Sequence, residues 1–477
     1  MRKSRILLAL FACTALTTAS AQFVEDDVEV LELFQGDQTG DWYGWVAGQL
    51  SDVNGDGVDE ILIPAIARDG FAGRVSLYSG ATGDVLNVID GAPGSAFGYS
   101  VSDAGDVDND GTHDYVIGGG LVQVYSGATN ALLHDVSAEV AGFAHSVSGV
   151  GDVNGDGHDD FMAGSRFQTV DLEFQGRIFV FSGADGSLLW SRNGDSAGAS
   201  LGSAAGLVGD VNRDGVKDFV VGATGENRAL LLDGTNGEIL HSLEPPDPSG
   251  SQFFAVFFAS GAGDVNRDGI GDVFVGDYSY EGDAMTIGRG EAYVFSGRSG
   301  RVLHRLRGFD MGDGFGPGRG VSDLNGDGFN DIVVASYNDS NGAASAGASY
   351  VFSGRSGALL RQMTATLAGD QFGVDALSVG DTDDDGFPDF VVTAVGQSFN
   401  GIDTGRVYLI AGNRLPCTSD IDGNRFVGFK DLLILLSDLG EAGGRSDLNG
   451  DGTVDHADKI VLLKDFGFCP RGKPRRR

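Results

Sequence analysis

Short apolar runs alternate with turns along most of the chain. Runs such as DFVVGA at residue 218 and DIVVAS at residue 331 are shorter than an ordinary helix and rich in β-branched side chains. The segments between them are built from Gly, Asp, Asn and Ser, which favour tight turns. This pattern predicts an all-β fold made of many short strands.

An acidic phrase of the type DVNGDG recurs down the chain in a constant frame. An apolar residue followed by Gly often precedes it, as in FGYSVSDAGD at residue 97, and a strand, a second strand ending in Ser-Gly and a further apolar run follow it. With the run before the phrase, each repeat contains four predicted strands. Successive copies lie between 46 and 59 residues apart, and they begin at Asp52, Asp106, Asp152, Asp210, Asp264, Asp323 and Asp381.

Seven four-stranded units, none able to bury both of its faces alone, predict a seven-bladed β-propeller. A parallel β-helix is the alternative, but its coils are shorter than about 50 residues. The seventh repeat ends at GRVYLIAGN, residues 405–413, without an outer strand, and an unassigned strand, VEVLELFQG, begins at residue 28. We therefore expect Val28–Phe34 to pair beside Val407–Ile410 and to close the ring.

Composition narrows the class of protein. Gly contributes 78 of 477 residues, but with only 10 Pro and no Gly-X-Y period the chain is not collagen-like. The hydrophobic fraction of 41% is sufficient for a core. The formal net charge of −36 argues against nucleic-acid binding, which needs clustered Lys and Arg. So many carboxylates require either solvation or bound cations.

Residues 1–21 are interpreted as an export signal. Three cations precede the apolar run Ile6–Leu16, and the sequence ASA at residue 19 provides a cleavage site. A membrane anchor is one alternative, for which the run is short, and a lipidated Cys13 is another. No other segment approaches about 20 apolar residues, so we expect a secreted or cell-surface protein without a membrane span.

Aligned, the seven acidic loops follow D-x-[DN]-x-D-G-x-x-[DE]. Oxygen donors at positions 1, 3, 5 and 9, with a carbonyl from position 7, suit Ca²⁺ better than Mg²⁺, and Gly at position 6 permits the bend. Plain turns are the alternative. The shared frame, and the 23 mutually repelling carboxylates at ligand positions, favour metal binding. The predicted ligands are Asp52, Asn54, Asp56, Glu60, Asp106, Asp108, Asp110, Asp114, Asp152, Asn154, Asp156, Asp160, Asp210, Asn212, Asp214, Asp218, Asp264, Asn266, Asp268, Asp272, Asp323, Asn325, Asp327, Asp331, Asp381, Asp383, Asp385 and Asp389.

The frame FG…GDVNGDG…D resembles the FG-GAP repeat of integrin alpha-subunit propellers and of related bacterial secreted proteins. The resemblance covers about residues 22–413 and implies a propeller whose loops bind Ca²⁺ structurally. The first repeat departs by carrying the longer Glu60 at position 9. The fifth reads AVFFASGAGD, and the sixth has one residue fewer between Phe315 and Asp323.

A different duplication occupies residues 414–470, ahead of a basic tail at 471–477. DIDGNRFVGFKDLLILLSDLG at residue 420 and DLNGDGTVDHADKIVLLKDFG at residue 447 each fit a 12-residue acidic loop followed by an amphipathic helix. They resemble the paired EF-hand-type calcium loops of a dockerin, a small α-helical domain. Arg425 replaces the Gly expected in the first loop. Gly428 at position 9 has no side chain to act as a ligand, so a water would take that place, and we expect the second site to bind the ion more tightly. The predicted ligands are Asp420, Asp422, Asn424, Asp431, Asp447, Asn449, Asp451, Asp455 and Asp458.

Cys417 and Cys469 bracket this unit. In an exported chain we expect a disulfide, worth roughly 4 kcal/mol on the loop-entropy model, with two free thiols as the alternative. The dockerin resemblance implies a cohesin-like protein partner. The pairs FK at residue 429 and HA at residue 456 differ from the Ser/Thr pair common there, so another surface module, or no partner, stays open as an alternative.

Strand alternation places the acidic loops on one face of the ring and the connections between second and third strands on the other. Aromatic side chains in these connections suit contact with a sugar or a protein. The alternative is that they pack locally within their loops. Four of the connections are long: Ser165–Gly176, Asp277–Gly290, Ser336–Gly347 and Val395–Gly405. Their aromatic residues are Phe167, Phe174, Tyr278, Tyr280, Tyr337 and Phe399.

No catalytic residue is predicted. The chain has neither G-x-S-x-G nor H-E-x-x-H, and its propeller histidines (residues 113, 134, 145, 158, 241 and 304) are interpreted as surface or turn residues. We expect a secreted, calcium-stabilised, non-catalytic module that binds a protein or glycan and is attached through its dockerin-like domain. The alternative is a carbohydrate-active enzyme, a polysaccharide lyase or hydrolase, recruited by the same domain.

Overall fold

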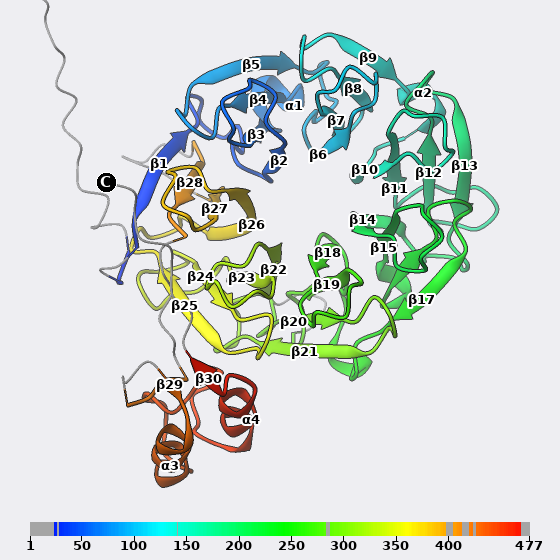
Figure 1. Ribbon diagram of the computed structural model, residues 1–477. Coiled ribbons are helices and arrows are strands. Elements are labelled where there is room, and N and C mark those ends of the chain that lie inside the picture. The colour runs from blue at the N-terminus through cyan, green and yellow to red at the C-terminus, as the bar shows by residue number, and fades with distance from the viewer. Residues whose placement is uncertain are drawn as a thin grey trace, which may run out of the picture.

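The computed structural model describes residues 23–25, 28–140, 142–282, 287–396, 404–412, 419–422 and 426–468. Within these ranges, seven four-stranded antiparallel sheets surround a common axis and form a ring (Figure 1). The predicted seven-bladed propeller is confirmed. The predicted export signal, the two cysteines of the expected disulfide and the basic tail lie outside the described residues.

The first six blades each run in chain order from an inner strand at the axis to an outer strand at the rim. Blade 1 contains β2 (Gly48–Leu50), β3 (Glu60–Ala65), β4 (Arg74–Tyr78) and β5 (Val85–Asp90). Blade 2 contains β6 (Ser100–Gly105), β7 (Asp114–Gly118), β8 (Gln123–Tyr125) and β9 (Leu132–Asp135). Blade 3 contains β10 (Ser146–Gly151), β11 (Asp160–Ser165), β12 (Arg177–Phe181) and β13 (Leu188–Asn193).

The next three blades repeat this arrangement. Blade 4 contains β14 (Leu201–Gly209), β15 (Asp218–Ala223), β16 (Arg228–Leu232) and β17 (Ile239–Leu243). Blade 5 contains β18 (Ala259–Gly263), β19 (Asp272–Asp277), β20 (Glu291–Phe295) and β21 (Val302–Arg307). Blade 6 contains β22 (Phe315–Val321), β23 (Asp331–Ser336), β24 (Ala348–Phe352) and β25 (Leu359–Thr364). Single helical turns occur in the connections: α1 (Arg68–Phe71), α2 (Ser137–Val140), η2 (Thr224–Glu226) and η3 (Pro248–Gly250).

The seventh blade takes its outer strand from the N-terminal end of the described chain. It contains β26 (Phe372–Gly380), β27 (Asp389–Ala394), β28 (Arg406–Ile410) and β1 (Val30–Gln35). In the antiparallel β1–β28 pair, Leu33 lies opposite Tyr408 and Phe34 opposite Val407. The predicted closure of the ring is confirmed. Phe34 also packs on Tyr78 of blade 1, with ring centroids 4.7 Å apart, so the closing strand contacts both of the blades that meet there.

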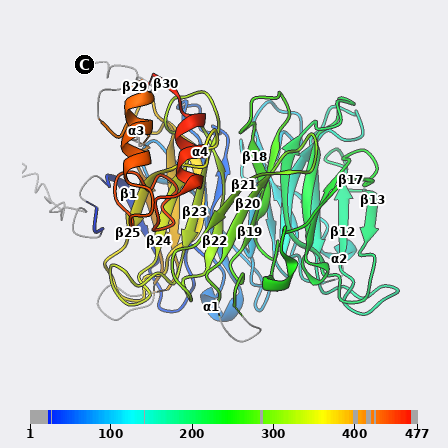
Figure 2. The same cartoon turned by 90° about the horizontal axis from the view of Figure 1, so that it is seen from below.

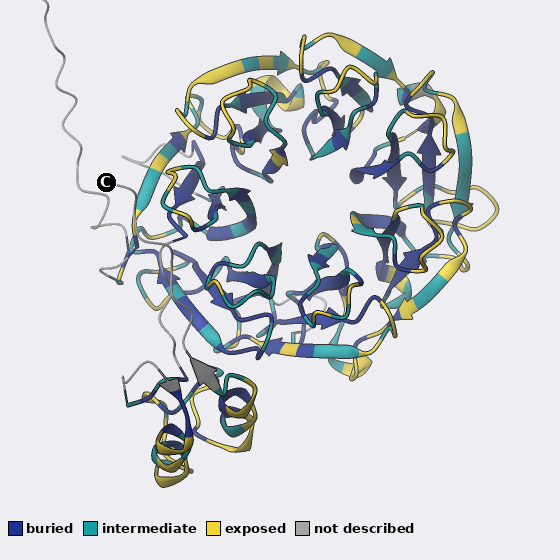
Figure 3. Ribbon diagram, in the orientation of Figure 1, coloured by how far each residue is buried: buried dark blue, intermediate teal, exposed yellow. Residues whose placement is uncertain are grey.

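The hydrophobic core lies between neighbouring blades. Val220 and Leu231 of blade 4, for example, pack in one cluster with Val273 and Tyr293 of blade 5. The second strand of every blade is buried along its whole length, because a blade covers each of its faces. The rim strands expose many more residues, as Figure 3 shows for β5, β9 and β13.

A β-bulge leads into most of the acidic loops. In blade 3 the pairing shifts between Gly149 and Gly151, and Gly151 has a φ of +76°, which Gly adopts without steric cost. Blades 2, 4, 5 and 7 contain the same shift. Blades 1 and 6 carry Ser51 and Ser322 at this position and continue in register to the loop. Blade 6 still forms all four strands, so the residue missing from the sixth repeat leaves the blade intact.

The apolar-Gly frame joins neighbouring blades. The Phe315 nitrogen donates to the Arg289 carbonyl at 3.1 Å, and Gly290 and Phe315 form a parallel bridge. Gly290 has a φ of +86°, and a Cβ there would lie 1.8 Å from the Phe315 carbonyl oxygen. A side chain at this position would separate the blades. Equivalent bridges join Gly73 to Phe97, Gly176 to Leu201 and Gly347 to Phe372.

Side chains on the outer strands also link one blade to the next. His304 Nε2 donates to the Gly354 carbonyl in the turn of the following blade. The interpretation of His304 as a surface or turn residue is therefore wrong: blade 6 covers the side chain, which is 8% exposed. Corresponding links run from His134 to Gly183, from Trp190 to Gly234, from His241 to Arg298 and from Arg361 to Ala411.

A small helical unit lies beside the ring (Figure 2). It contains β29 (Phe426–Val427), α3 (Phe429–Ser437), α4 (His456–Lys464) and β30 (Gly467–Phe468), and β29 pairs with β30. Its core, which includes Leu435 and Leu462, extends to Ala358 of blade 6. The Leu359 nitrogen of that blade donates to the Leu448 carbonyl at 3.0 Å. The C-terminal unit therefore packs on the sixth blade.

A search of the described residues for a helix long and apolar enough to cross a membrane finds none.

Candidate metal loops and channel mouth

Each acidic loop turns around its first aspartate. In blade 3, Asp152 Oδ1 accepts hydrogen bonds from the nitrogens of Gly155 and Asp156 at 2.7 and 3.1 Å, and its Oδ2 accepts one from Gly157 at 2.9 Å. Asn154 Oδ1 accepts from the Asp156 nitrogen at 2.9 Å. The side chains at positions 1, 3 and 5 thus organise the backbone of a single tight turn.

The departures in the fifth and sixth repeats leave this turn unchanged. Asp264 Oδ1 accepts from the Asp268 nitrogen at 3.0 Å, and Asp323 Oδ1 accepts from the Asp327 nitrogen at the same distance. The conformation of the acidic loop therefore depends on hydrogen bonds within the loop and not on the pairing of the strand before it.

Position 9 ties the loop to the Ser-Gly turn of its own blade. Asp160 is fully buried, and its Oδ2 accepts from the Val153 nitrogen at 2.9 Å while its Oδ1 accepts from the Gly183 nitrogen at 2.8 Å. Burial raises the pKa of Asp160 to about 6. The sequence predicted this residue as a metal ligand, but not as a structural link. Equivalent contacts join Asp114 to Gly127, Asp218 to Gly234, Asp272 to Gly297, Asp331 to Gly354 and Asp389 to Gly412.

Blade 1 differs because Glu60 replaces aspartate. Glu60 Oε2 accepts from the Val53 nitrogen at 2.9 Å, but the buried Oε1 has no hydrogen-bond partner in the described part of the chain. Burial, together with the charges of Asp52 and Asp56, raises the pKa of Glu60 to about 7. A buried carboxylate oxygen without a donor is unfavourable, and a divalent cation held by the same three side chains would satisfy it.

Three propeller loops bring three acidic side chains close enough to share one ion. In each, one ligand atom per residue lies within 4.8 Å of the others, which suits oxygen ligands placed about 2.3–2.6 Å from Ca²⁺. The residues therefore fit the expected ion. These clusters are Asp52, Asp56 and Glu60; Asp106, Asp108 and Asp114; and Asp381, Asp383 and Asp385.

Asparagine at position 3 changes the charge balance in other loops. The amide nitrogens of Asn154 and Asn212 donate to the position-5 carboxylates Asp156 and Asp214 at 2.9 and 3.0 Å. A side-chain amide thus offsets part of the charge that an aspartate at position 3 would add. Among the predicted propeller ligands, the structure gathers the carboxylates of blades 1, 2 and 7 most closely.

The first C-terminal loop also gathers carboxylates. Asp420, Asp422 and Asp431 form a cluster of the same kind, and Asp431 accepts from the nitrogens of Asp422 and Gly428 at 3.0 and 2.8 Å. Lys430 Nζ lies 2.6 Å from Asp422 Oδ2 and competes for that oxygen. The predicted ligand Asn424 lies outside the described residues.

The second C-terminal loop has an unsatisfied oxygen. Asp447 Oδ1 is buried and has no hydrogen-bond partner among the described residues, whereas its Oδ2 accepts from the Gly452 nitrogen at 2.9 Å. Asp458 is fully buried and accepts from the nitrogens of Leu448 and Asp455, both at 2.7 Å. The orphaned Asp447 oxygen gives this loop the same feature as the Glu60 loop.

A cavity of about 760 Å³ lies along the axis of the ring, inside the innermost strands. Its lining extends from His113 and Asp159, beside the acidic loops, to aromatic residues near the long loops. We call the aromatic end the channel mouth. Its lining side chains are Trp45, Tyr99, His145, Phe257, Tyr278 and Tyr337.

The rings of the channel mouth contact one another across blades. Trp45 lies 5.7 Å from Tyr99 and 6.2 Å from Phe257, and Tyr278 lies 6.4 Å from Phe257 and 6.3 Å from Tyr337, all between ring centroids. The sequence predicted the loop residues Tyr278 and Tyr337. It did not predict Trp45, Tyr99 or Phe257, because these precede the first strand of their blades and carry no motif.

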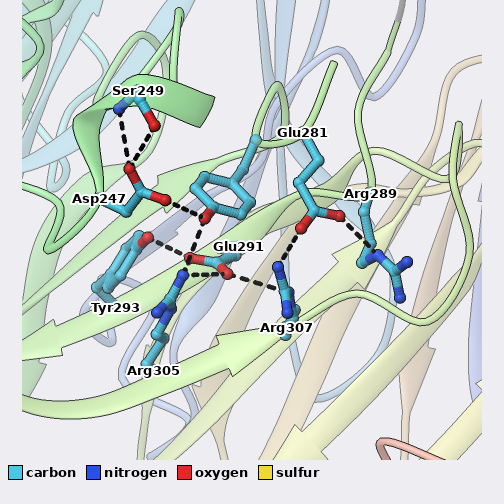
Figure 4. Close-up of polar contacts among 9 residues, drawn as sticks. Asp247, Ser249, Glu281, Arg289, Glu291, Tyr293, Arg305 and Arg307 are labelled. Carbon is cyan, nitrogen blue, oxygen red and sulfur yellow. Dashed lines mark hydrogen bonds and ion pairs between the residues drawn. The ribbon is translucent and has the colours of Figure 1, made fainter.

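Figure 4 shows a second polar cluster, in blade 5. Glu291 is fully buried and accepts from Arg305 Nε and Nη2 at 2.9 and 2.8 Å, as well as from the Tyr293 hydroxyl. Arg307 pairs with both Glu281 and Glu291. Tyr280, one of the predicted loop aromatics, is 4% exposed and lies under Arg305, so it packs locally. The charges of this cluster compensate one another and connect the outer strands of blade 5.

Comparison with known proteins agrees with the propeller. Residues 323–392 match the model of the FG-GAP-like repeat, and residues 143–181 match that of the FG-GAP repeat. Integrin alpha-5 of Xenopus laevis is 29% identical over 221 residues, which is 42% of this chain and 20% of that protein. Integrin alpha-V of Gallus gallus is 30% identical over 217 residues, with the same shares. Integrin alpha-PS3 of Drosophila melanogaster is 35% identical over 180 residues, which is 30% of this chain and 15% of that protein.

The chain therefore has an FG-GAP propeller that is similar to integrin alpha chains. The matched segments span a fifth or less of the length of these relatives.

Proposed function

We propose that this protein is an exported, calcium-stabilised binding module. Its propeller, residues 22–413, recognises a glycan or protein ligand at the channel mouth, and its dockerin-like domain, residues 414–470, attaches it to a partner protein. The resemblance to integrin alpha chains, together with the absence of a recognisable catalytic motif, supports a binding role over an enzymatic one. The predicted export signal supports an extracellular or cell-surface location.

Calcium acts here as a structural ion. Asp52, Asp56 and Glu60 would hold it in blade 1, where the Glu60 Oε1 atom has no donor among the residues that the structure describes. In the other blades the position-9 aspartate already connects loop and turn, and an ion would relieve the repulsion among the remaining carboxylates. Bound ions would therefore stabilise the acidic face of the ring and leave the opposite face free for ligands.

The C-terminal unit supports attachment to a partner through its exposed apolar side chains. Leu433 on α3 and Ile460 on α4 are 67% and 48% exposed, and Leu436 and Leu463 are 42% and 48% exposed. Both pairs occupy equivalent positions of the duplication, 27 residues apart. Each helix thus presents the same two apolar positions, which suits docking of a partner protein.

The observation that supports ligand binding most directly is the channel mouth, where partly exposed aromatic rings from several blades line the end of the cavity. The test is to screen the full-length protein against a glycan array and a protein array with calcium present. Reproducible binding that Trp45→Ala and Tyr278→Ala both weaken is the expected result. Retained binding in both variants would show that the ligand binds elsewhere on the protein. Turnover of a polysaccharide that either variant loses would show that the mouth is a catalytic site.

Attachment is tested separately with the variant Leu433→Glu/Ile460→Glu. Charged residues at both apolar positions should abolish capture by cohesin-type or surface modules without changing ligand binding at the propeller. The matched control is Lys459→Glu, which lies on the same helix and alters charge without removing an apolar side chain. Equal capture by the wild type and the double variant would show that this face is not the docking surface.

A further inference from the structure

Arg166 lies at the channel mouth and stacks between two aromatic rings. Its guanidinium carbon is 4.4 Å from the centroid of Phe167 and 5.6 Å from that of Phe257. Phe257 lines the cavity, and Phe167 is half exposed at its rim. The guanidinium therefore sits between the cavity wall and solvent.

This guanidinium has no anionic partner. Its Nε atom is buried without a hydrogen-bond acceptor, and the side chain makes no ion pair with any described residue. Burial lowers the pKa of Arg166, and the neighbours that favour its charge are the hydroxyls of Tyr99 and Tyr278 rather than carboxylates. Arg305, by contrast, pairs with the buried Glu291 (Figure 4). In a chain of net charge −36, a partly buried cation that no described carboxylate reaches can pair with the anion of a ligand.

His145 contributes a second unsatisfied polar atom in the same wall. Its Nδ1 is buried without a partner in the described structure, and its ring centroid is 5.0 Å from that of Phe167. Burial lowers the pKa of His145 to about 4, so the imidazole is neutral at physiological pH. A neutral imidazole can donate to or accept from a hydroxyl group.

The surrounding aromatic side chains leave part of their surface open. Phe167 is 51% exposed and Phe257 is 36% exposed, and Trp45, Tyr99 and Tyr278 are partly exposed. The cavity of about 760 Å³ is within the usual size range of small-ligand sites. Apolar ring faces beside a few convergent polar groups match a pyranose, which has apolar C–H faces and hydroxyls at its edge.

We propose that the channel mouth binds a saccharide that carries a carboxylate group, such as a uronic acid unit. Arg166 pairs with the carboxylate, His145 hydrogen-bonds a hydroxyl, and the aromatic side chains stack on the sugar rings. The inference rests on the proposed function, because it assigns the class of ligand to the same site.

The same observations disfavour other ligands. A cationic ligand would meet aromatic faces on which Arg166 already lies. A densely charged polyanion would be repelled by the net charge of the chain, whereas a single carboxylate at a desolvated arginine needs only a local pair. An acidic segment of a protein would satisfy Arg166 alone but would leave the sugar-sized cavity behind it unused.

The test is calorimetric titration of the full-length protein, at constant calcium, with three probes that carry a single carboxylate: galacturonate, glucuronate and mannuronate. Each is paired with its methyl ester, which has the same sugar without the charge. The variant Arg166→Gln removes the guanidinium. Its matched control is Arg177→Gln, because Arg177 also belongs to blade 3 and lies over a phenylalanine, Phe179, which, unlike Phe257, does not line the cavity.

At least one acid probe should bind while its methyl ester does not. The substitution Arg166→Gln should weaken the affinity for that acid about 10- to 100-fold, as expected for the loss of a charge-assisted hydrogen bond. Arg177→Gln should bind like the wild type. The thermal midpoint of Arg166→Gln should equal or exceed that of the wild type, since the variant loses an uncompensated buried charge.

Failure of all three acids, or binding that Arg166→Gln leaves unchanged, would overturn the proposal. Binding of neutral sugars at the mouth, lost in Trp45→Ala, would overturn the carboxylate assignment while leaving the proposed binding function intact. An acidic peptide that binds through Arg166 when no saccharide does would replace the saccharide by a protein ligand.

Discussion

Among the described position-9 side chains of the seven blades, Glu60 accepts hydrogen bonds through one carboxylate oxygen only, and the donor is the Val53 nitrogen. The Val53 nitrogen donates to Glu60 Oε2 at 2.9 Å, and Glu60 Oε1 stays buried without a donor. In the other six blades the second oxygen accepts from the glycine of the turn after the third strand. Blade 1 is thus the place where an ion would replace a protein hydrogen bond most directly.

Substitution of Glu60 by Gln should reduce the stabilisation that calcium gives. The amide loses the charge that attracts the ion, and a tenfold weaker site lowers the calcium-linked free energy by about 1.4 kcal/mol when calcium is in excess. Thermal unfolding measured with and without calcium gives this difference. Glu32→Gln, on the exposed side of β1, is the control and should match the wild type. Identical calcium shifts for all three proteins would rule out Glu60 as a ligand.

Removal of divalent ions should lower the thermal midpoint of the whole chain. The clustered carboxylates of blades 1, 2 and 7 would then repel one another without compensation. A chelator titration followed by circular dichroism measures the loss, and calcium should restore the midpoint more completely than magnesium, which demands octahedral geometry. A midpoint insensitive to the chelator would mean that the loops are hydrogen-bonded turns and no more.

Gly290→Ala should destabilise the ring more than Gly94→Ala. Both glycines have positive φ, at +86° and +79°, so each variant loses about 1–2 kcal/mol through backbone strain. Only at Gly290 would the new Cβ also meet another blade, 1.8 Å from the Phe315 carbonyl, whereas nothing lies within 4 Å at Gly94. Urea unfolding of the two variants compares these costs. Equal losses would show that the bridge between blades yields without penalty.

His304 should contribute a pH dependence to stability. Burial, with the nearby charge of Lys464, lowers the pKa of His304 from 6.5 to about 4 in the folded state. The unfolded chain binds the proton more tightly than the folded protein. The neutral His304 side chain therefore makes its full contribution to the free energy of unfolding above about pH 6.5, and this contribution is lost as the pH falls toward 4. The loss amounts to roughly 3 kcal/mol across that window.

The measurement is the difference in unfolding free energy between the wild type and His304→Gln at a series of pH values, with calcium held constant. This difference should shrink between pH 6.5 and 4. His241→Gln, the equivalent link of blade 4 with a less buried side chain, serves as the control. A difference independent of pH would mean that the buried imidazole does not titrate.

Phe34→Ala should weaken the closure of the ring. The side chain is 5% exposed and packs on Tyr78, and truncation of a buried phenylalanine costs about 3–5 kcal/mol. Limited proteolysis at the β1–β28 pair and thermal unfolding report the loss. Glu32→Ala, the exposed neighbour on the same strand, should behave like the wild type.

The sequence predicted the number of blades, the strands of each blade and the closing pair, because each depends on a repeated local pattern. The acidic loops were equally predictable, since Asp152 and its neighbours determine the turn through contacts a few residues apart. Contacts between distant residues were not. The bond from Asp160 to Gly183 within blade 3 and the bond from His304 to Gly354 between blades 5 and 6 join residues 23 and 50 positions apart, and no local pattern marks either pair.

The channel mouth was predicted only in part for the same reason. Tyr278 and Tyr337 belong to long loops whose position could be inferred, but Trp45, Tyr99 and Phe257 come from three other connections. Arg166 was not singled out, because an arginine in a loop gives no signal of whether a carboxylate will reach it. Only the arrangement of the blades shows that none of the described carboxylates pairs with Arg166.

The pairing of β1 with β28 has a consequence for biosynthesis. The first strand of the propeller is synthesised long before the last one, which is its partner, so the ring cannot be completed until the seventh blade has been made. Until then β1 has no partner strand, and its unpaired edge can pair with another molecule. A nascent chain that stalls before its seventh blade would therefore expose this unpaired edge and associate readily with other molecules.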